Sequence, residues 1–184
     1  MHSKDFILHK ESVLSSEDCN NIITFFEDNS HLHRKGQRCE DTEMFLETVG
    51  KTPINSLLAR ALSICTDEYQ QEYAFINKIK SWTIAPTFKL QRYNAGEGYF
   101  TLHCENDGPD FTGESSEMLI LAWMIYLNDV TDGGYTEFPS QNTKFQPRRG
   151  DLLIWPAYFT HPHRGIVSKT QVKYILTGWY AFNY

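Results

Sequence analysis

The chain has 184 residues, of which 41% are hydrophobic and 14% aromatic. This composition excludes a disordered protein and fits one folded domain with a sizeable core over residues 1–184. The formal net charge of −6 gives no general attraction to nucleic acid or to an anionic membrane, so we expect neither as a partner. The sequence has no apolar run long enough to span a membrane and no secretory signal at its start, and we expect a cytoplasmic protein.

Residues 1–78 are expected to be mainly helical and to support the rest of the domain. The run Ser15–Asp18 is typical of a capped helix start, because a hydroxyl and a carboxylate there satisfy free backbone N–H groups. A second helix is predicted to open at Thr52, with Pro53 in its first turn. Residues 29–50, between the two helices, show no sustained period and are interpreted as a loop or lid with a solvated, charged surface.

From about residue 79 the pattern changes to short strands and turns. The nearly continuous apolar run Met118–Leu127 predicts a strand that is buried on both faces, although periodicity alone also permits a helix. Further strands are predicted at Tyr135–Phe138, Asp151–Trp155 and Val172–Phe182. Helices followed by many short strands predict an α+β fold, with a sandwich or jelly roll over residues 79–184.

The four cysteines are spread along the chain and form no C-x-x-C pair. They are Cys19, Cys39, Cys65 and Cys104. In a reducing compartment we therefore expect four free thiols, and neither a zinc ribbon nor a dithiol redox motif.

The first chemical signal is His103 and Glu105. On a strand these two side chains would share one face, about 6.6 Å apart, and could converge on a metal ion. Asp107 is a poorer candidate because it lies two residues further along. The Pro-broken turn after the strand at 151–155 offers a third ligand, either His161 or His163. Two imidazoles and a carboxylate are typical of non-haem Fe(II) oxygenases and less typical of zinc sites.

The second signal is a lysine within an apolar strand. Strand alternation places Lys173, Ile175, Thr177 and Trp179 on one face. If this face points inward, Lys173 is costly to bury unless it meets an anion. If the face is exposed, Lys173 is an ordinary edge charge, and the sequence leaves both readings open.

In this order the residues resemble the 2-oxoglutarate and Fe(II)-dependent dioxygenases, most closely the prolyl 4-hydroxylase-like branch with its small bacterial and phage forms. The resemblance covers roughly residues 79–184. The motifs that carry it are Tyr93-x-x-Gly96-x-x-Tyr99, His103-x-Glu105, Tyr126-Leu127-Asn128-Asp129, Gly133-Gly134-x-Thr136-x-Phe138-Pro139, Gly150-Asp151, Trp155-Pro156, His163-Arg164-Gly165, Lys173 and Trp179.

The resemblance implies a double-stranded β-helix, or jelly roll, flanked by the N-terminal helices. It implies His103, Glu105 and His163 as iron ligands. It also implies that Lys173 pairs with the distal carboxylate of 2-oxoglutarate. The remaining implied residues are Thr136 as a helper of Lys173, Tyr93 as a hydrogen-bond donor near the co-substrate, and Trp179 on the substrate side.

Two departures from the family and one choice accompany these assignments. Glu105 stands where the family usually has Asp, and the step from Tyr93 to His103 is one residue longer than usual. His163 is preferred to His161 because it lies ten positions before Lys173, which is the common spacing in the family.

The implied activity is hydroxylation of a substrate C–H bond with release of succinate and CO2. It requires Fe(II), 2-oxoglutarate and O2, with ascorbate as an optional reductant. A prolyl residue, in a peptide or as free proline, is the leading substrate, and the segments 29–50 and 106–117 are candidates to clamp a peptide. Two alternatives stay open: a hydroxylase of a nucleobase or another small molecule, and a non-catalytic, cupin-like metal-binding protein.

Overall fold

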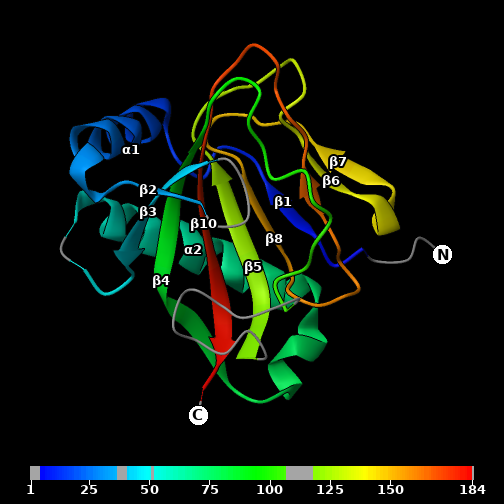
Figure 1. Ribbon diagram of the computed structural model, residues 1–184. Coiled ribbons are helices and arrows are strands. Elements are labelled where there is room, and N and C mark those ends of the chain that lie inside the picture. The colour runs from blue at the N-terminus through cyan, green and yellow to red at the C-terminus, as the bar shows by residue number, and fades with distance from the viewer. Residues whose placement is uncertain (1–4, 37–40, 51, 107–117, 184) are drawn as a thin grey trace.

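The computed structural model describes residues 5–36, 41–50, 52–106 and 118–183. Two long helices precede most of the strands in the chain, as the sequence predicts (Figure 1). The helices are α1 (Ser16–Asp28) and α2 (Pro53–Glu72), with short 3-10 helices η1 (Ser30–Leu32), η2 (Ala74–Lys78) and η4 (Pro139–Gln141).

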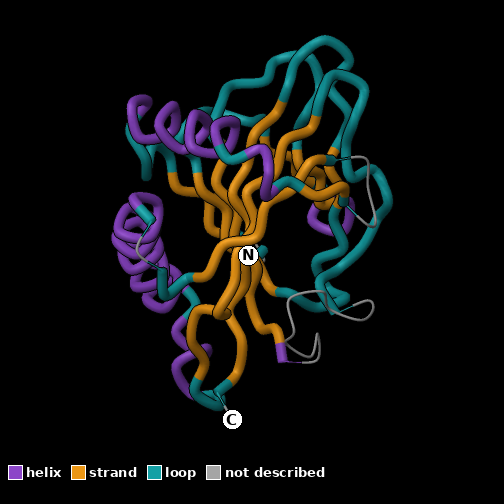
Figure 2. Tube along the Cα trace, turned by 60° about the vertical axis from the view of Figure 1, so that its left-hand side comes forward, coloured by secondary structure: helices purple, strands orange, loops and turns teal. Residues whose placement is uncertain are grey.

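The strands form a seven-stranded sheet and a three-stranded sheet, in which neighbouring strands are antiparallel. In spatial order the large sheet contains β1 (Leu8–Lys10), β8 (Leu152–Pro156), β5 (Leu119–Tyr126), β10 (Lys173–Phe182), β4 (Trp82–Tyr93), β3 (Thr42–Glu47) and β2 (Arg34–Lys35). The small sheet contains β7 (Thr143–Phe145), β6 (Thr136–Phe138) and β9 (Arg164–Gly165). Both long helices lie on one side of the large sheet (Figure 2). The predicted α+β, double-stranded β-helix architecture is confirmed.

The helix starts follow the capping chemistry that the sequence predicts. The Ser15 hydroxyl accepts a hydrogen bond from the Asp18 backbone N–H at 3.0 Å, and the Asp18 carboxylate accepts one from the Ser15 N–H at 3.2 Å. At α2, Asn55 accepts from the Thr52 N–H at 3.2 Å and donates to the Glu47 carbonyl at 2.8 Å. These contacts satisfy N–H groups that have no partner within the helix.

Strand β5 is buried along its whole length, which confirms the interpretation of the apolar run. From Leu121 to Tyr126 its side chains alternate between two apolar clusters, one beneath the helices and one on the opposite, inner face of the sheet. For example, Trp123 packs in the helix-side cluster and Met124 in the inner one. β10 alternates in the same way, with Leu176 toward the helices and Ile175 and Trp179 inward. The inner face of the large sheet, opposite the helices, is therefore the face on which the site lies.

The interpretation of residues 29–50 as a loop is wrong for part of that segment. Residues 42–47 form β3, which pairs with β4, and residues 34–35 form β2 at the sheet edge. Glu43 of β3 and Asp41 just before it are buried. Because these buried positions are polar, the sequence shows no apolar alternation that would have predicted a strand here. The short strand β1 was also not predicted. Segment 107–117 lies outside the described residues.

Two composition-based expectations concern thiols and membranes. Cys19, Cys65 and Cys104 are free thiols, as expected, and Cys39 lies outside the described residues. Over the ranges that the structure covers, no helix has the length and apolarity needed to cross a membrane.

We predict that Gly178→Ala destabilises the fold. A Cβ atom at this position would lie 2.7 Å from Cε2 of Trp123, and that indole is fully buried. Overpacking of this kind costs about 1–3 kcal/mol, which would appear as a lower midpoint of urea unfolding. Ser63→Ala on the exposed side of α2 is the control, with an expected change of no more than about 0.5 kcal/mol. Equal stability of the Gly178 variant and the wild type would contradict this account of the β5–β10 packing.

Candidate metal centre

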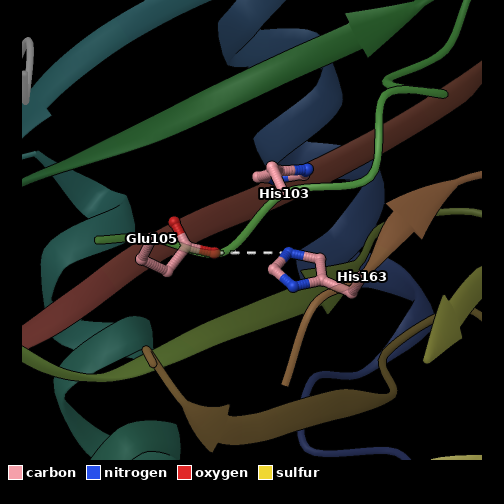
Figure 3. Close-up of side chains that lie close together, drawn as sticks. All are labelled: His103, Glu105 and His163. Atoms are coloured by element: carbon pink, nitrogen blue, oxygen red, sulfur yellow. Dashed lines mark ion pairs between the residues drawn. The ribbon is translucent and has the colours of Figure 1, made fainter. Parts of the chain in front are cut away.

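Three side chains that can ligate a metal gather above the inner face of the large sheet. They are His103, Glu105 and His163, and one ligand atom from each lies within 4.8 Å of the other two. His103 and Glu105 lie on the segment after β4, and His163 directly precedes β9 (Figure 3). The segment around His103 is not a regular strand but makes one antiparallel bridge to His163.

Backbone hydrogen bonds hold the two ligand segments together. The His103 N–H donates to the His163 carbonyl at 3.0 Å, and the His163 N–H donates to the His103 carbonyl at 2.8 Å. The Glu105 N–H donates to the Ala157 carbonyl at 3.1 Å. The distance between the ligands is therefore fixed by main-chain pairing, before any ion binds.

Both histidines of the cluster are oriented by carbonyl oxygens. Nδ1 of His103 lies 2.9 Å from the Thr101 carbonyl, and Nδ1 of His163 lies 3.1 Å from the His161 carbonyl. A carbonyl oxygen can only accept, so each Nδ1 carries the proton and donates it. Each ring thus presents Nε2 as its metal-ligating atom, an arrangement typical of metal-bound histidine.

Glu105 contacts both a histidine and a tryptophan of the site. Its Oε1 lies 3.2 Å from Nε2 of His163, and its Oε2 accepts a hydrogen bond from the Trp179 indole N–H at 2.7 Å. Burial by itself would raise the pKa of Glu105, but the hydrogen bond from His163, the charges of His163 and His103 and the Trp179 donor together lower it to about 2. The side chain is therefore an ionised ligand over the whole physiological range.

The ring of His161 makes its hydrogen bonds outside the ligand cluster. Its Nε2 donates to the Asp5 carbonyl at 2.7 Å, and its Nδ1 lies 2.9 Å from the Thr160 hydroxyl. Burial lowers the pKa of His161, which keeps the ring neutral. Both nitrogens of His161 are engaged with the protein, and its backbone carbonyl orients His163.

Lys173 lies on the inner face, so the reading of this residue as an exposed edge charge is wrong. The side chain is buried, and its Nζ donates to the Gly134 carbonyl at 3.1 Å. The same Nζ lies 4.9 Å from the centroid of the Tyr93 ring, on the neighbouring strand. The buried ammonium and the buried phenol therefore meet, as expected if they serve one ligand.

Thr136 reaches the same region from the small sheet. It pairs in register with Gly165, and a methyl group added at Gly165 would lie 3.4 Å from the Lys173 Nζ. The Thr136 hydroxyl accepts a hydrogen bond from the Tyr126 hydroxyl at 2.7 Å. In the sequence, Tyr126 belongs to one of the motifs of the resemblance but received no role. Its position at the end of the apolar run that forms β5 could have indicated that it faces the site.

Two other contributors to the site also stood in the quoted motifs without an assigned role. Tyr99 stacks on His103 with ring centroids 3.9 Å apart, and Phe138 lies 5.3 Å from the His163 ring. Each of these rings packs against one histidine of the cluster. The carbonyls of Thr101 and His161, which set the tautomers, also escaped prediction because they belong to the backbone and leave no side-chain signature.

A fold of this kind, with two histidines and a carboxylate beside a buried lysine on its inner face, defines an iron-dependent oxygenase class. A family model described as the 2OG-Fe(II) oxygenase superfamily matches residues 88–181, more than half of the chain. The chain belongs to this superfamily, and the resemblance inferred from the sequence is confirmed.

Individual relatives are prolyl hydroxylases by name. A protein of Arabidopsis thaliana named "Probable prolyl 4-hydroxylase 9" is 27% identical over an alignment of 118 residues, and the match covers 50% of this chain and 40% of that protein. The chain thus corresponds to less than half the length of this relative. The collagen prolyl hydroxylase of Paramecium bursaria Chlorella virus 1 has a similar structure, with a TM-score of 0.71, 18% identity and 97% of both chains covered.

A third relative was solved with a peptide. The prolyl hydroxylase of Trichoplax adhaerens, in complex with a fragment of the hypoxia inducible factor oxygen degradation domain, gives a TM-score of 0.66 at 17% identity. The match covers 97% of this chain and 84% of that one. At such identities the two structural likenesses establish the fold alone.

We predict a pH-dependent contribution of Glu105 to the stability of the metal-free protein. Because its pKa in the fold, about 2, is below the ordinary value of 4.5, its ionisation stabilises the fold fully above pH 4.5. This stabilisation is lost as the pH falls toward 2. In urea unfolding, the stability difference between wild type and Glu105→Gln should shrink over this interval, where free histidines are already protonated. A difference that stays constant would contradict the environment assigned to Glu105.

Proposed function

We propose that this protein is a prolyl hydroxylase-type dioxygenase that uses Fe(II), 2-oxoglutarate and O2 to hydroxylate a prolyl residue in a peptide. The observation that carries the proposal is the convergence of His103, Glu105 and His163 above the sheet face that buries Lys173. Residues 1–184 act as one domain in this proposal, since the helical part packs against the sheet that supports the site.

The three ligand side chains fit a ferrous ion. Two neutral imidazole Nε2 atoms and one carboxylate form the ligand set used by non-haem Fe(II) oxygenases. Glu105 substitutes for the shorter Asp of the family, and its longer side chain is held by the Trp179 indole. When bound, Fe(II) with 2-oxoglutarate and O2 supplies the oxidising chemistry that converts a C–H bond to C–OH and releases succinate and CO2.

The inner-face lysine fits the co-substrate. Its buried ammonium would pair with the distal carboxylate of 2-oxoglutarate, and a buried cation gains most from such a charge-assisted contact. Tyr93 would donate a hydrogen bond near the same anion, and Thr136 would help from the small sheet. Each of these roles follows the family resemblance and is compatible with the burial of the three side chains.

The proposal of a prolyl substrate is supported by the named relatives and by the position of Trp179 next to Glu105. Both the Arabidopsis and viral relatives are named for prolyl hydroxylation, and the Trichoplax relative was solved with a peptide. Trp179, next to Glu105, would line the substrate side. A peptide is favoured over free proline, and the nucleobase alternative receives less support because the chain has a formal net charge of −6.

We predict that the two histidines near residue 162 behave differently. His163→Ala should lose metal binding, because it removes a ligand atom from the cluster. His161→Ala should still bind metal, with affinity reduced by about 10–100-fold at most, because its ring contacts the protein and only supports a ligand. Anaerobic titration calorimetry with Fe(II) or Mn(II) checks this. A metal-free His161 variant beside a His163 variant that retains iron would reverse the assignment.

We predict succinate formation that requires both Fe(II) and 2-oxoglutarate, together with a gain of one oxygen atom on a proline-containing peptide, measured by mass spectrometry. Lys173→Met should raise the 2-oxoglutarate concentration needed for half-maximal rate by at least about tenfold, since a charge-assisted contact is lost, while Fe(II) still binds. Binding of metal without succinate formation would instead identify a cupin-like binding protein.

A further inference from the structure

A second lysine lies on the inner face of the large sheet, in a position that the family resemblance does not assign. Lys89 of β4 is paired in register with Phe45 of β3 and with Thr177 of β10. Its Nζ lies 3.3 Å from Oε2 of Glu43, and the side chains of Lys89 and Glu43 are 18% and 8% exposed. An ion pair is thus almost enclosed in the sheet face that carries the proposed site.

Trp179 joins this ion pair to the metal centre. The Lys89 Nζ lies 5.7 Å from the centroid of the Trp179 ring and 4.9 Å from that of the Phe45 ring. The indole N–H of the same Trp179 donates to Glu105. A substrate group that packs against Trp179 next to the metal would therefore come within reach of the Lys89 ammonium.

Stability alone does not account for this pair. Enclosed ion pairs roughly break even against well-packed apolar residues, because desolvation offsets the Coulomb attraction. An ammonium group has three N–H donors, and among the residues that the structure describes Lys89 has Glu43 as its anionic partner. Donors therefore remain for a further acceptor.

The charge around Lys89 indicates which acceptor fits. Asp41 is buried behind Gln91, which donates to it at 2.7 Å, and Arg34 lies opposite Glu43 in register and over the Phe45 ring. Of these groups, Glu43 directly balances the charge of Lys89. An incoming carboxylate would upset this balance, whereas a neutral carbonyl oxygen would accept a hydrogen bond from Lys89 and leave the balance unchanged.

The neighbouring polar groups are fixed by hydrogen bonds to each other. The Gln91 amide donates to Asp41 and to the Tyr93 hydroxyl, and its oxygen accepts from Thr177 at 2.7 Å. Burial raises the pKa of Glu43, although Lys89 opposes this. Glu43 pairs in register with Gln91 and contacts the Lys89 ammonium at 3.3 Å, which makes it a positioning residue for Lys89.

We propose that Lys89 is a specificity-determining residue whose ammonium donates a hydrogen bond to a backbone carbonyl of a peptide substrate lying against Trp179. This inference rests on the proposed prolyl hydroxylase function and deepens it: the site selects an uncharged stretch of peptide rather than the carboxylate of a free amino acid.

Peptide binding tests the inference without turnover. A fluorescent proline-containing peptide with acetylated and amidated ends is titrated into protein loaded with Mn(II) and 2-oxoglutarate, and anisotropy gives the dissociation constant. Lys89→Met, which keeps the apolar stem, should weaken binding by at least about tenfold, the effect of losing a hydrogen bond to a charged group. Lys89→Arg keeps a donor and should restore most of the affinity.

The matched control is Lys144→Met. Lys144 also lies over an aromatic ring, at 4.9 Å from the Tyr135 centroid, but it is exposed on β7 in the small sheet. This variant should bind the peptide as the wild type does. Calorimetry of 2-oxoglutarate binding to the Lys89 variants should also match the wild type, which shows that the metal and co-substrate sites are intact.

Steady-state hydroxylation provides a second readout. Lys89→Met should raise KM for the capped peptide by at least about tenfold with little change in kcat, and should leave KM for free proline unchanged. Unaltered peptide affinity, or equal losses for peptide and 2-oxoglutarate, would overturn the inference and leave a structural ion pair. If the wild type itself binds 2-oxoglutarate but no prolyl peptide, the proposed substrate fails and the inference fails with it, an outcome that differs from a defect confined to Lys89.

Discussion

The metal centre depends on the antiparallel bridge between His103 and His163. These residues are far apart in the chain, yet their backbones exchange two hydrogen bonds, of 3.0 and 2.8 Å. Because the Glu105 N–H is also bound to the Ala157 carbonyl, the segment after β4 is attached to the segment after β8 at two points. The ligand geometry is thus preorganised by main-chain pairing, which is the condition for a precise metal site. The side chains need only adopt the rotamers that the carbonyls of Thr101 and His161 favour.

Strand β10 connects this centre to the core. One of its faces packs under the helices through Leu176 and Tyr180, while the other carries Lys173 at its start and Trp179 in its second half. Its neighbours β4 and β5 pair with it along most of its length. A change on the helix side of β10, such as one at Gly178, therefore lies next to Trp179, whose indole contacts Glu105. Fold stability and site geometry share the same strand.

The sequence predicted the parts of the structure whose signals are local. Capping residues and helical periods identified α1 and α2, an apolar run identified β5, and the ordered motifs identified the ligand candidates. β3 was missed because the charged residues Glu43 and Glu47 interrupt its apolar pattern, and the burial of Glu43 follows from pairing with β4, which no local pattern encodes. The burial of Lys173 stayed open for a similar reason, since alternation defines two faces but does not say which one is covered. The choice of His163 rested on spacing, whereas the structure adds a physical reason, the engagement of both His161 nitrogens.

Under the proposed function, Trp179 couples metal ligation to substrate recognition. Its N–H donates to Glu105, and its ring lies next to the Lys89 ammonium, so replacing this indole would disturb both a proposed metal ligand and the proposed substrate side. Loss of activity in a Trp179 variant therefore could not be attributed to either role. Lys89 lies over the Trp179 ring, whereas Glu105 accepts a hydrogen bond from the indole N–H, and the charge of Lys89 is balanced by Glu43. If the proposal holds, Lys89 is the residue at which substrate binding can be altered while the metal-ligand cluster keeps its own contacts.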